Sequence, residues 1–430
     1  MNKRALCLLL PLSFPAPALA QEPPEMAPPA EAVPLEEIKR YVSVFRTVKQ
    51  AYVDEVSDER LMQAAIRGLL TDLDPHSAYL DAEQTQSLNE AATGAYDGIG
   101  LELVQQPDRS LLVIAPIDDT PAARAGMRPG DIITAIDGRP IEADSVEAAV
   151  AILRGEPGTT VTLTVLREGQ PAPLDVAVTR ETIRITSVRA RLLEPGYGYL
   201  RISTFQSDTG PDLRKRLREL AKNAPLHGLV LDLRSNPGGL LNAAIEAADA
   251  FLDTGVIVST KGRLPFSASE FRATPGDLLA GAPIVALIDS GTASAAEVLA
   301  GALRDHRRAL VMGSRSFGKG SVQTVLPLDN GDSIKLTTAR YYTPSGRSIQ
   351  AAGIKPDIVL ADDYERRADT RPPSLRERDL PGHLRGDEED SVPADDAGGE
   401  EVDFAVREAL NVLKGLNVFG ARDPARTGAQ

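Results

Sequence analysis

The run Ala282-Pro-Ile-Val-Ala-Leu-Ile288 is followed by Asp289-Ser-Gly-Thr-Ala293 and then by Ser294-Ala-Ala-Glu-Val-Leu-Ala-Gly-Ala-Leu303. The first segment is apolar and predicts a strand, and the last is rich in small helix-forming residues and predicts a helix. A short polar turn joins the two. The same alternation recurs at 197–202, 212–223, 229–233 and 240–252. Strands that alternate with helices indicate an α/β domain, which we place at residues 183–360.

Before this domain, residues 93–182 show a different sequence pattern, which predicts short strands separated by glycine and proline. The loop Gly98-Ile-Gly-Leu101 comes first, Ala125-Gly-Met-Arg-Pro-Gly-Asp-Ile-Ile133 follows, and a helix is expected at 145–154. In this order the segments resemble a PDZ domain, which implies a small β-sandwich with two helices. The predicted fold class is therefore an α+β and α/β multidomain protein with an inserted PDZ domain.

The N-terminal part of the chain reads as an export signal followed by helices. Lys3 and Arg4 precede an apolar stretch, and Ala18-Leu-Ala20 fits the small-x-small cleavage rule, so residues 1–20 predict a signal peptide. Residues 21–34 form a proline-rich tether. Residues 35–92 show apolar residues at spacings of three and four and predict a helical region, with 74–80 as a turn that starts another helix. We therefore expect a periplasmic or otherwise exported protein that is soluble after signal cleavage.

The C-terminal part is acidic and then amphipathic. Residues 361–403 are poor in large apolar side chains and predict a disordered linker, and residues 404–417 predict a terminal helix. The net charge is −14, which argues against nucleic acid as a partner. The single cysteine, Cys7, lies inside the predicted signal, so neither a disulfide nor a thiol reaction is expected in the mature chain.

Ser294 and Lys319 form the candidate chemical site. Ser294 would open a helix, where free N–H groups and the helix dipole favour a developing negative charge. Lys319 lies between two glycines in Ser316-Phe-Gly-Lys-Gly-Ser-Val-Gln323. A neutral, desolvated lysine can remove the proton from a serine hydroxyl. Each residue also has an ordinary interpretation, Ser294 as a helix N-cap and Lys319 as a solvated turn lysine. Whether Gln323 neighbours Lys319 depends on local structure, which the spacing leaves open.

A histidine base has no obvious candidate among the four histidines of the chain. His306 follows Ser294 by twelve residues on the same predicted helix, about 18 Å away at the helical rise. His227 precedes the strand at 229–233, at the wrong end for the loop that follows. That loop, Asn236-Pro-Gly-Gly239, exposes backbone N–H groups suited to an oxyanion, although an ordinary strand-to-helix turn has the same pattern.

Together these motifs resemble the carboxy-terminal processing peptidases, also called tail-specific proteases. The resemblance runs through Asp74-Pro-His-Ser-Ala-Tyr-Leu80, Thr292-Ala-Ser-Ala-Ala-Glu297, Thr343-Pro-Ser-Gly-Arg-Ser-Ile-Gln350 and Gly353-Ile-Lys-Pro-Asp357, besides the segments quoted above. It implies that Ser294 is the nucleophile, Lys319 the general base and Gln323 the residue that orients the lysine. It also implies an oxyanion hole built from the N–H groups of Ala295 and of one glycine of the Gly238-Gly239 pair, of which we prefer Gly238. Thr292 and Ala296 depart from the usual family motif without removing a catalytic group.

The resemblance further implies how substrates are recognised. The backbone of Gly98, Ile99, Gly100 and Leu101 would hold the C-terminal carboxylate of a protein substrate. Independently of the resemblance, Arg154 ends the helix expected at 145–154, where its side chain could reach the α/β domain and gate the protease. Its ordinary interpretation is a solvated arginine at a helix C-terminus. No cofactor and no metal are expected. An adaptor protein and a homo-oligomer through the terminal helices stay open as partners. The alternative is a catalytically silent PDZ scaffold or peptide-binding protein. A trypsin-like PDZ protease is disfavoured because its Gly-Asn-Ser-Gly-Gly motif is missing.

Overall fold

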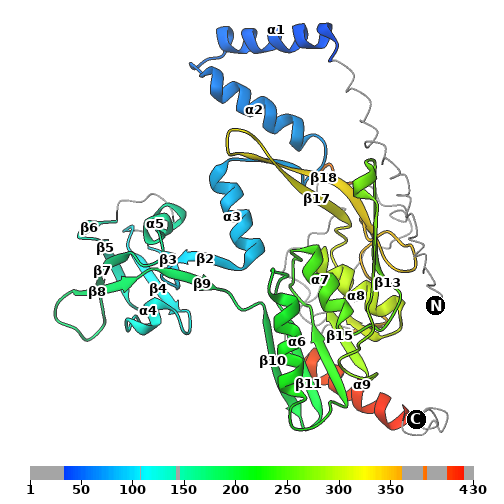
Figure 1. Ribbon diagram of the computed structural model, residues 1–430. Helices are drawn as coiled ribbons and strands as arrows, with labels where there is room; N and C mark the ends of the chain where they lie inside the picture. The colour runs from blue at the N-terminus through cyan, green and yellow to red at the C-terminus, as the bar shows by residue number, and fades with distance from the viewer. Residues whose placement is uncertain (1–32, 107, 142–145, 361–380, 385–403, 421–430) are drawn as a thin grey trace, which may run out of the picture. The chain divides into compact units, whose positions relative to one another are not determined.

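The computed structural model describes residues 33–106, 108–141, 146–360, 381–384 and 404–420 (Figure 1). The chain forms two compact units, Met1–Ala65 and Ile66–Gln430. The predicted signal peptide, nearly all of the tether and most of the acidic linker lie outside the described residues. Of the helices that the structure describes, none is long and apolar enough to cross a membrane.

The first unit contains helix α1 (Leu35–Ala51) and the start of α2 (Asp58–Thr71). The Tyr41 hydroxyl donates to the Met62 sulfur over 3.0 Å, and Lys49 forms an ion pair with Asp58. No residue of α1 is buried, so its apolar stripe is exposed. The expected amphipathic helix is present.

The segment that follows differs from the sequence expectation. Ala78–Leu80, predicted as part of a turn, is strand β1 and pairs antiparallel with β18 (Ser333–Tyr342). Helix α3 (Ala82–Thr93) follows, and its N-cap residue Asp81 forms a capping box with Gln84. Tertiary pairing therefore overrode a turn signal that was correct only for residues 74–77.

Residues 95–184 form the PDZ module. A five-stranded antiparallel path runs β3-β4-β5-β7-β8, with β6 added to β5, and a separate ladder joins β2 to β9. The bounds are β2 (Ala95–Gly98), β3 (Leu101–Gln105), β4 (Leu111–Pro116), α4 (Pro121–Arg124), β5 (Ile132–Ile136), β6 (Arg139–Pro140), α5 (Val146–Leu153), β7 (Thr160–Leu166), β8 (Leu174–Thr179) and β9 (Glu181–Arg184). The module has its own apolar core, which includes Leu111, Ile133 and Leu163.

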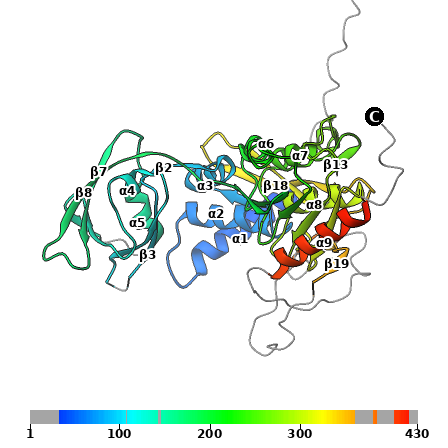
Figure 2. The same ribbon diagram turned by 90° about the horizontal axis from the view of Figure 1, so that it is seen from below.

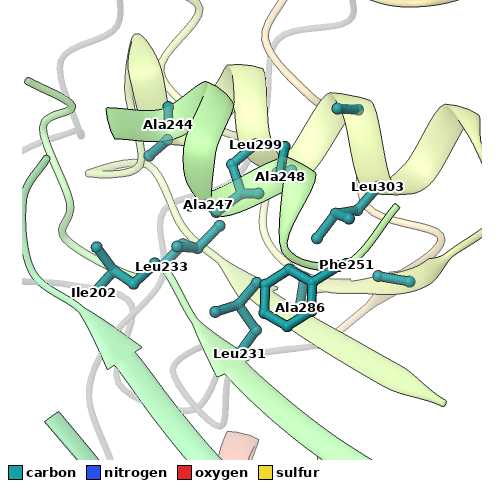
Figure 3. Close-up of a cluster of buried hydrophobic side chains, with 14 of the residues drawn as sticks. Ile202, Leu231, Leu233, Ala244, Ala247, Ala248, Phe251, Ala286, Leu299 and Leu303 are labelled. Carbon is teal, nitrogen blue, oxygen red and sulfur yellow. The ribbon is translucent and has the colours of Figure 1, made fainter. Parts of the chain in front are cut away.

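The α/β core is built on a six-stranded sheet in the order β10-β11-β12-β15-β16-β19, parallel from β11 onward. Helices α6, α7 and α8 cover one face (Figure 1). Leu231 of β12 and Leu233 just after it pack there with Ala247 of α7, Phe251 just after α7 and Leu299 of α8 (Figure 3). The bounds are β10 (Val188–Glu194), β11 (Tyr197–Ile202), α6 (Thr209–Leu220), β12 (Gly228–Asp232), α7 (Leu241–Asp249), β15 (Ile284–Ile288), α8 (Ala295–Asp305), β16 (Ala309–Gly313) and β19 (Ile358–Val359).

A second sheet has the strand order β1-β18-β13-β14, and β17 also pairs with β18. Its remaining elements are β13 (Val256–Gly262), the 3₁₀ turn η1 (Pro265–Ser267), β14 (Ser269–Arg272) and β17 (Ser321–Pro327). Through β1 and β17, this sheet connects the Asp74 segment with the strand that follows Lys319. The predicted fold class, a multidomain mixture of α/β core and PDZ domain, is confirmed.

The C-terminal helix α9 (Phe404–Gly420) lies on the other face of the α/β sheet (Figure 2). Val406, Ala409 and Leu413 are buried against a group of sheet residues that includes Val230 and Val285. The helix extends three residues beyond the predicted end. Part of its apolar face is thus covered by its own chain, which weakens the reason for expecting α9 to be an oligomerisation arm. A homo-oligomer through the terminal helices stays a prediction.

Candidate active site

Ser294 lies in a sharp turn between β15 and α8. Its backbone has φ 55° and ψ −117°, and its side chain is nearly buried. An ordinary N-cap residue has extended dihedrals, whereas a non-glycine residue at positive φ stores about 1–3 kcal/mol of strain. A strained strand-to-helix turn is how other hydrolases present a nucleophilic serine. The backbone geometry therefore disfavours the interpretation of Ser294 as an ordinary cap.

Glu297, three residues along α8, joins the two candidate residues. One carboxylate oxygen, Oε2, accepts from the Ser294 N–H at 2.7 Å and from the Lys319 N–H at 2.9 Å. The other, Oε1, accepts from the Gly318 N–H at 2.8 Å and from the Ser316 hydroxyl. The residue is completely buried. A single carboxylate thus brings the backbones of Ser294 and Lys319 together.

The lysine loop is held from two further directions. The Phe317 N–H donates to the Thr292 carbonyl over 3.0 Å, which joins it directly to the serine turn. On the other side, the Gly320 N–H donates to Gln350 Oε1 over 2.9 Å. A Cβ on Gly320 would lie 2.3 Å from the backbone nitrogen of Gln350, so only glycine fits there. The glycine before Lys319 and the glycine after it thus permit close backbone contact.

The Asn236-Pro-Gly-Gly239 loop lies against the serine turn. A Cβ on Gly238 would be 2.8 Å from Ser294 Cβ and 3.0 Å from the Ala295 nitrogen. The Gly238 N–H, however, donates to Asn236 Oδ1 over 2.9 Å. An oxyanion would have to compete with Asn236 for this N–H. The location of the loop suits an oxyanion hole, and the choice of Gly238 over Gly239 stays a prediction.

Gln323 lies in strand β17, so it is not the helical neighbour of Lys319. Its side-chain nitrogen donates to Ser321 Oγ at 2.9 Å and to Thr337 Oγ1 at 3.2 Å. Thr337 in turn donates to Asp74. Burial acts to raise the pKa of Asp74, but hydrogen bonds from Ser77, His76 and Thr337 outweigh it and lower the pKa. The Asp74 segment is thereby connected to Gln323, while the role of Gln323 in orienting the lysine remains a prediction.

The histidines near this region have other contacts. His306 is the C-cap of α8, and its Nε2 lies 2.6 Å from the Val256 carbonyl oxygen. The ring of His227 packs near Tyr197, at the start of β11. His306 therefore lies at the opposite end of α8 from Ser294, as the sequence predicts.

The predicted PDZ loop lines a pocket of about 330 Å³. The loop is held by its carbonyl groups, because Ile99 accepts from the Ala122 N–H and Gly100 from the Ile117 N–H. Arg154, which follows α5, also lines the pocket. Its guanidinium pairs with Glu90 of α3 and lies 5.7 Å from the centre of the Tyr96 ring. The arginine therefore reaches α3, and the expected contact with the α/β domain is wrong.

Comparison with known proteins identifies the parts of the chain. Residues 196–360 match peptidase family S41, residues 112–167 match a PDZ domain, and residues 18–84 match the N-terminal domain of the activating protease CtpB. A carboxy-terminal-processing protease of Bartonella bacilliformis is 42% identical over 90% of this chain and 91% of its own length. The chain belongs to the carboxy-terminal-processing proteases of peptidase family S41. It is a serine-type peptidase with a PDZ domain.

Other relatives are similar over less of their length. A probable CtpA-like serine protease of Staphylococcus aureus is 38% identical over 75% of this chain and 64% of its own. The solved photosystem II D1 C-terminal processing protease is 32% identical, with coverage of 76% and 94% and a TM-score of 0.45. The family resemblance drawn from the motifs is confirmed.

Glu297 is the site residue to which the sequence prediction gave no role. Its signal was present, since Ser294-Ala-Ala-Glu297 fits the Ser-x-x-Glu capping box. The motif places a glutamate beside the serine amide. It does not show that the same carboxylate receives two N–H groups and a hydroxyl from the lysine loop.

Replacing Glu297 with glutamine is expected to lower the kcat of this protease about 100-fold, the cost of misplacing reacting groups by about 1 Å. The amide keeps one acceptor oxygen but presents its NH₂ group to donors at the other position. The melting temperature should change little, because burial raises the pKa of Glu297 to about 7 and the neutral amide avoids the cost of the buried charge.

Steady-state kinetics and thermal melting would check this expectation. Glu219→Gln, on the exposed surface of α6, makes the same chemical change away from the site. Wild-type kcat in the Glu297 variant would show that the carboxylate does not align Ser294 with Lys319.

Proposed function

We propose that this protease is an exported endopeptidase that docks the C-terminus of a protein substrate in its PDZ domain and cleaves through a Ser294 ester. The observation that carries the mechanism is the shared carboxylate oxygen of Glu297, which accepts from the amides of both Ser294 and Lys319. A serine needs a nearby base to become a nucleophile, and Lys319 is the candidate beside it.

In the first step, Ser294 Oγ attacks the scissile carbonyl carbon and its proton passes to Lys319 Nζ. The oxyanion of the tetrahedral intermediate receives hydrogen bonds from the Ala295 N–H and a glycine N–H of the 238–239 loop. The first N–H groups of a helix have no acceptor within the helix, so the Ala295 N–H suits this role.

The intermediate then collapses to an ester of Ser294, and the amine leaves with the proton from Lys319. In the second half, water attacks the ester carbonyl and gives a proton to Lys319. Collapse releases the new C-terminal carboxylic acid, and the proton returns to Ser294 Oγ. Gln323 of β17 would orient the lysine, and its side-chain amide is itself held by a hydrogen bond to Thr337 Oγ1.

Substrate recognition is assigned to the Gly98–Leu101 loop. Successive backbone N–H groups bind carboxylates well, and carboxylate capture by a backbone loop is a common way to recognise C-termini. The PDZ pocket also borders Arg154 and its ion-pair partner Glu90. A docked chain that disturbs this pair would couple docking to turnover, which is the proposed gating role of Arg154.

The test of this function is a pair of unstructured substrates that differ only in a free or an amidated C-terminus. The free form should show a KM about tenfold lower, since the amide removes a charge-assisted set of hydrogen bonds. Arg154→Ala should lower kcat for both substrates. Equal KM values for the two forms would contradict C-terminal docking, and unchanged kcat in the arginine variant would contradict gating.

A further inference from the structure

Asp74 is a buried carboxylate in the turn that precedes β1. Its Oδ1 atom accepts from the N–H groups of His76 and Ser77 at 2.8 and 2.9 Å, and its Oδ2 atom accepts from the Ser77 hydroxyl at 2.7 Å. These three bonds close the turn. A fourth bond leaves it, because Oδ1 also accepts from the hydroxyl of Thr337, in β18, at 3.1 Å.

The turn is held against β18 by its backbone as well. Ala78 of β1 pairs with Lys335 of β18, and the Thr337 N–H donates to Ser77 Oγ at 3.1 Å. Strand pairing therefore sets the distance between Asp74 and Thr337, and the two side chains do not depend on each other to be placed.

Thr337 lies directly across the ladder from Gln323, in the strand that follows Lys319. The register of β17 against β18 shifts between Val322 and Gln323, so Gln323 lies beside a bulge. Bulges re-aim side chains and are common next to active sites. The Gln323 Nε2 atom donates to Thr337 Oγ1 at 3.2 Å and to Ser321 Oγ at 2.9 Å. Both hydroxyls thus hold the nitrogen end of the amide.

The direction of these hydrogen bonds decides which end of the amide faces Thr337. A carboxylate only accepts hydrogen bonds, and a hydroxyl group has a single hydrogen to donate. Burial acts to raise the pKa of Asp74, but its hydrogen bonds lower it, so the group is a carboxylate at neutral pH. The Thr337 hydrogen is therefore committed to Asp74, and the Thr337 oxygen can only accept from Gln323. The NH₂ group meets this demand, which turns the Gln323 carbonyl oxygen away from Thr337.

We propose that Asp74 is a positioning residue for the base Lys319. Acting through Thr337, it fixes the Gln323 amide so that the carbonyl oxygen is the end that accepts from the lysine N–H groups. A neutral lysine that acts as a base must aim its lone pair at the serine hydroxyl, so its own N–H groups need acceptors elsewhere. A flipped amide would instead present its NH₂ donors to the lysine. This inference rests on the proposed role of Gln323 and extends it to Asp74.

The experiment is a double-mutant cycle between Thr337→Val and Gln323→Ala in the full chain. Valine has the shape of threonine without its hydroxyl group. Thr338→Val is the matched control, because the Thr338 hydroxyl pairs with Thr324 Oγ1 at 2.7 Å and not with the Asp74 network. Values of kcat and KM are measured with an unstructured peptide whose C-terminus is amidated, so the result does not depend on C-terminal docking.

Thr337→Val should lower kcat about tenfold with little change in KM, in line with one lost hydrogen bond. Asp74→Asn should have a similar effect, because an asparagine amide can donate to Thr337 as well as accept from it and no longer fixes the direction. Thr337→Ser keeps the hydroxyl and should recover most of the activity. In the Gln323→Ala background neither Thr337→Val nor Asp74→Asn should lower kcat further, and Thr338→Val should match the wild type.

Three outcomes would overturn the proposal. If Thr337→Val lowers kcat by the same factor with and without Gln323, the network supports the fold and does not act through the amide. If Gln323→Ala is impaired while Thr337→Val and Asp74→Asn keep wild-type kcat, the role of Gln323 stands and that of Asp74 fails. Wild-type kcat in Gln323→Ala would remove Gln323 from the proposed mechanism, and the role of Asp74 fails with it.

Discussion

Ser294→Ala is expected to reduce peptide-bond cleavage at least about 10⁴-fold, to the background rate, because removal of a nucleophilic serine abolishes the covalent route. The fold should persist. Alanine has nearly the same volume, and the Glu297 bonds to the Ser294 and Lys319 backbone do not involve the lost hydroxyl. Loss of activity with an unchanged melting temperature would separate chemistry from folding.

Ser290→Ala is the matched control. Ser290 belongs to the same turn but precedes the helix by several residues, and it should retain wild-type activity. Cleavage of an unstructured protein by the purified Ser294 variant, at a rate near that of the wild type, would remove Ser294 from the mechanism.

Lys319→Arg is expected to be as inactive as Lys319→Ala, since arginine stays protonated and cannot accept the serine proton. The mechanism requires a neutral lysine, whose pKa must lie well below the ordinary value of about 10.4. Activity of the wild type should therefore rise with pH. Protonation of Glu297 should also lower activity at low pH, because burial raises its pKa to about 7. Below that pH the carboxylate gains a proton at a site where the Ser294 and Lys319 N–H groups require an acceptor.

A pH–rate profile of kcat/KM checks this expectation, with Lys355→Arg as an exposed lysine control. Activity that stays level from about pH 6 to pH 9, or an active arginine variant, would point to a different base.

Much of the fold could be predicted from local pattern. The apolar run before Asp289 and the small residues after Ser294 specify a strand and a helix that the structure contains, as β15 and α8. Strand β1 was missed because three residues carry too little periodicity, and only their pairing with β18 makes them a strand. The apolar face of α9 was visible in the sequence, but the surface that covers it was not.

The site was predictable as a set of residues and less so as an arrangement. Ser294, Lys319 and the glycine loop stand out by motif, but spacing cannot show that the Glu297 carboxylate joins the first two. The same limit applies to Arg154, whose partner on α3 is distant in sequence.

The most direct test of the central claim is the site and rate of labelling by a fluorophosphonate probe, located by peptide mass spectrometry. The wild type should carry one adduct, on Ser294, and Lys319→Arg should label at least about 100-fold more slowly, because general-base catalysis contributes that much. An adduct on another residue, or equal labelling of the arginine variant, would contradict a Ser294 nucleophile activated by Lys319.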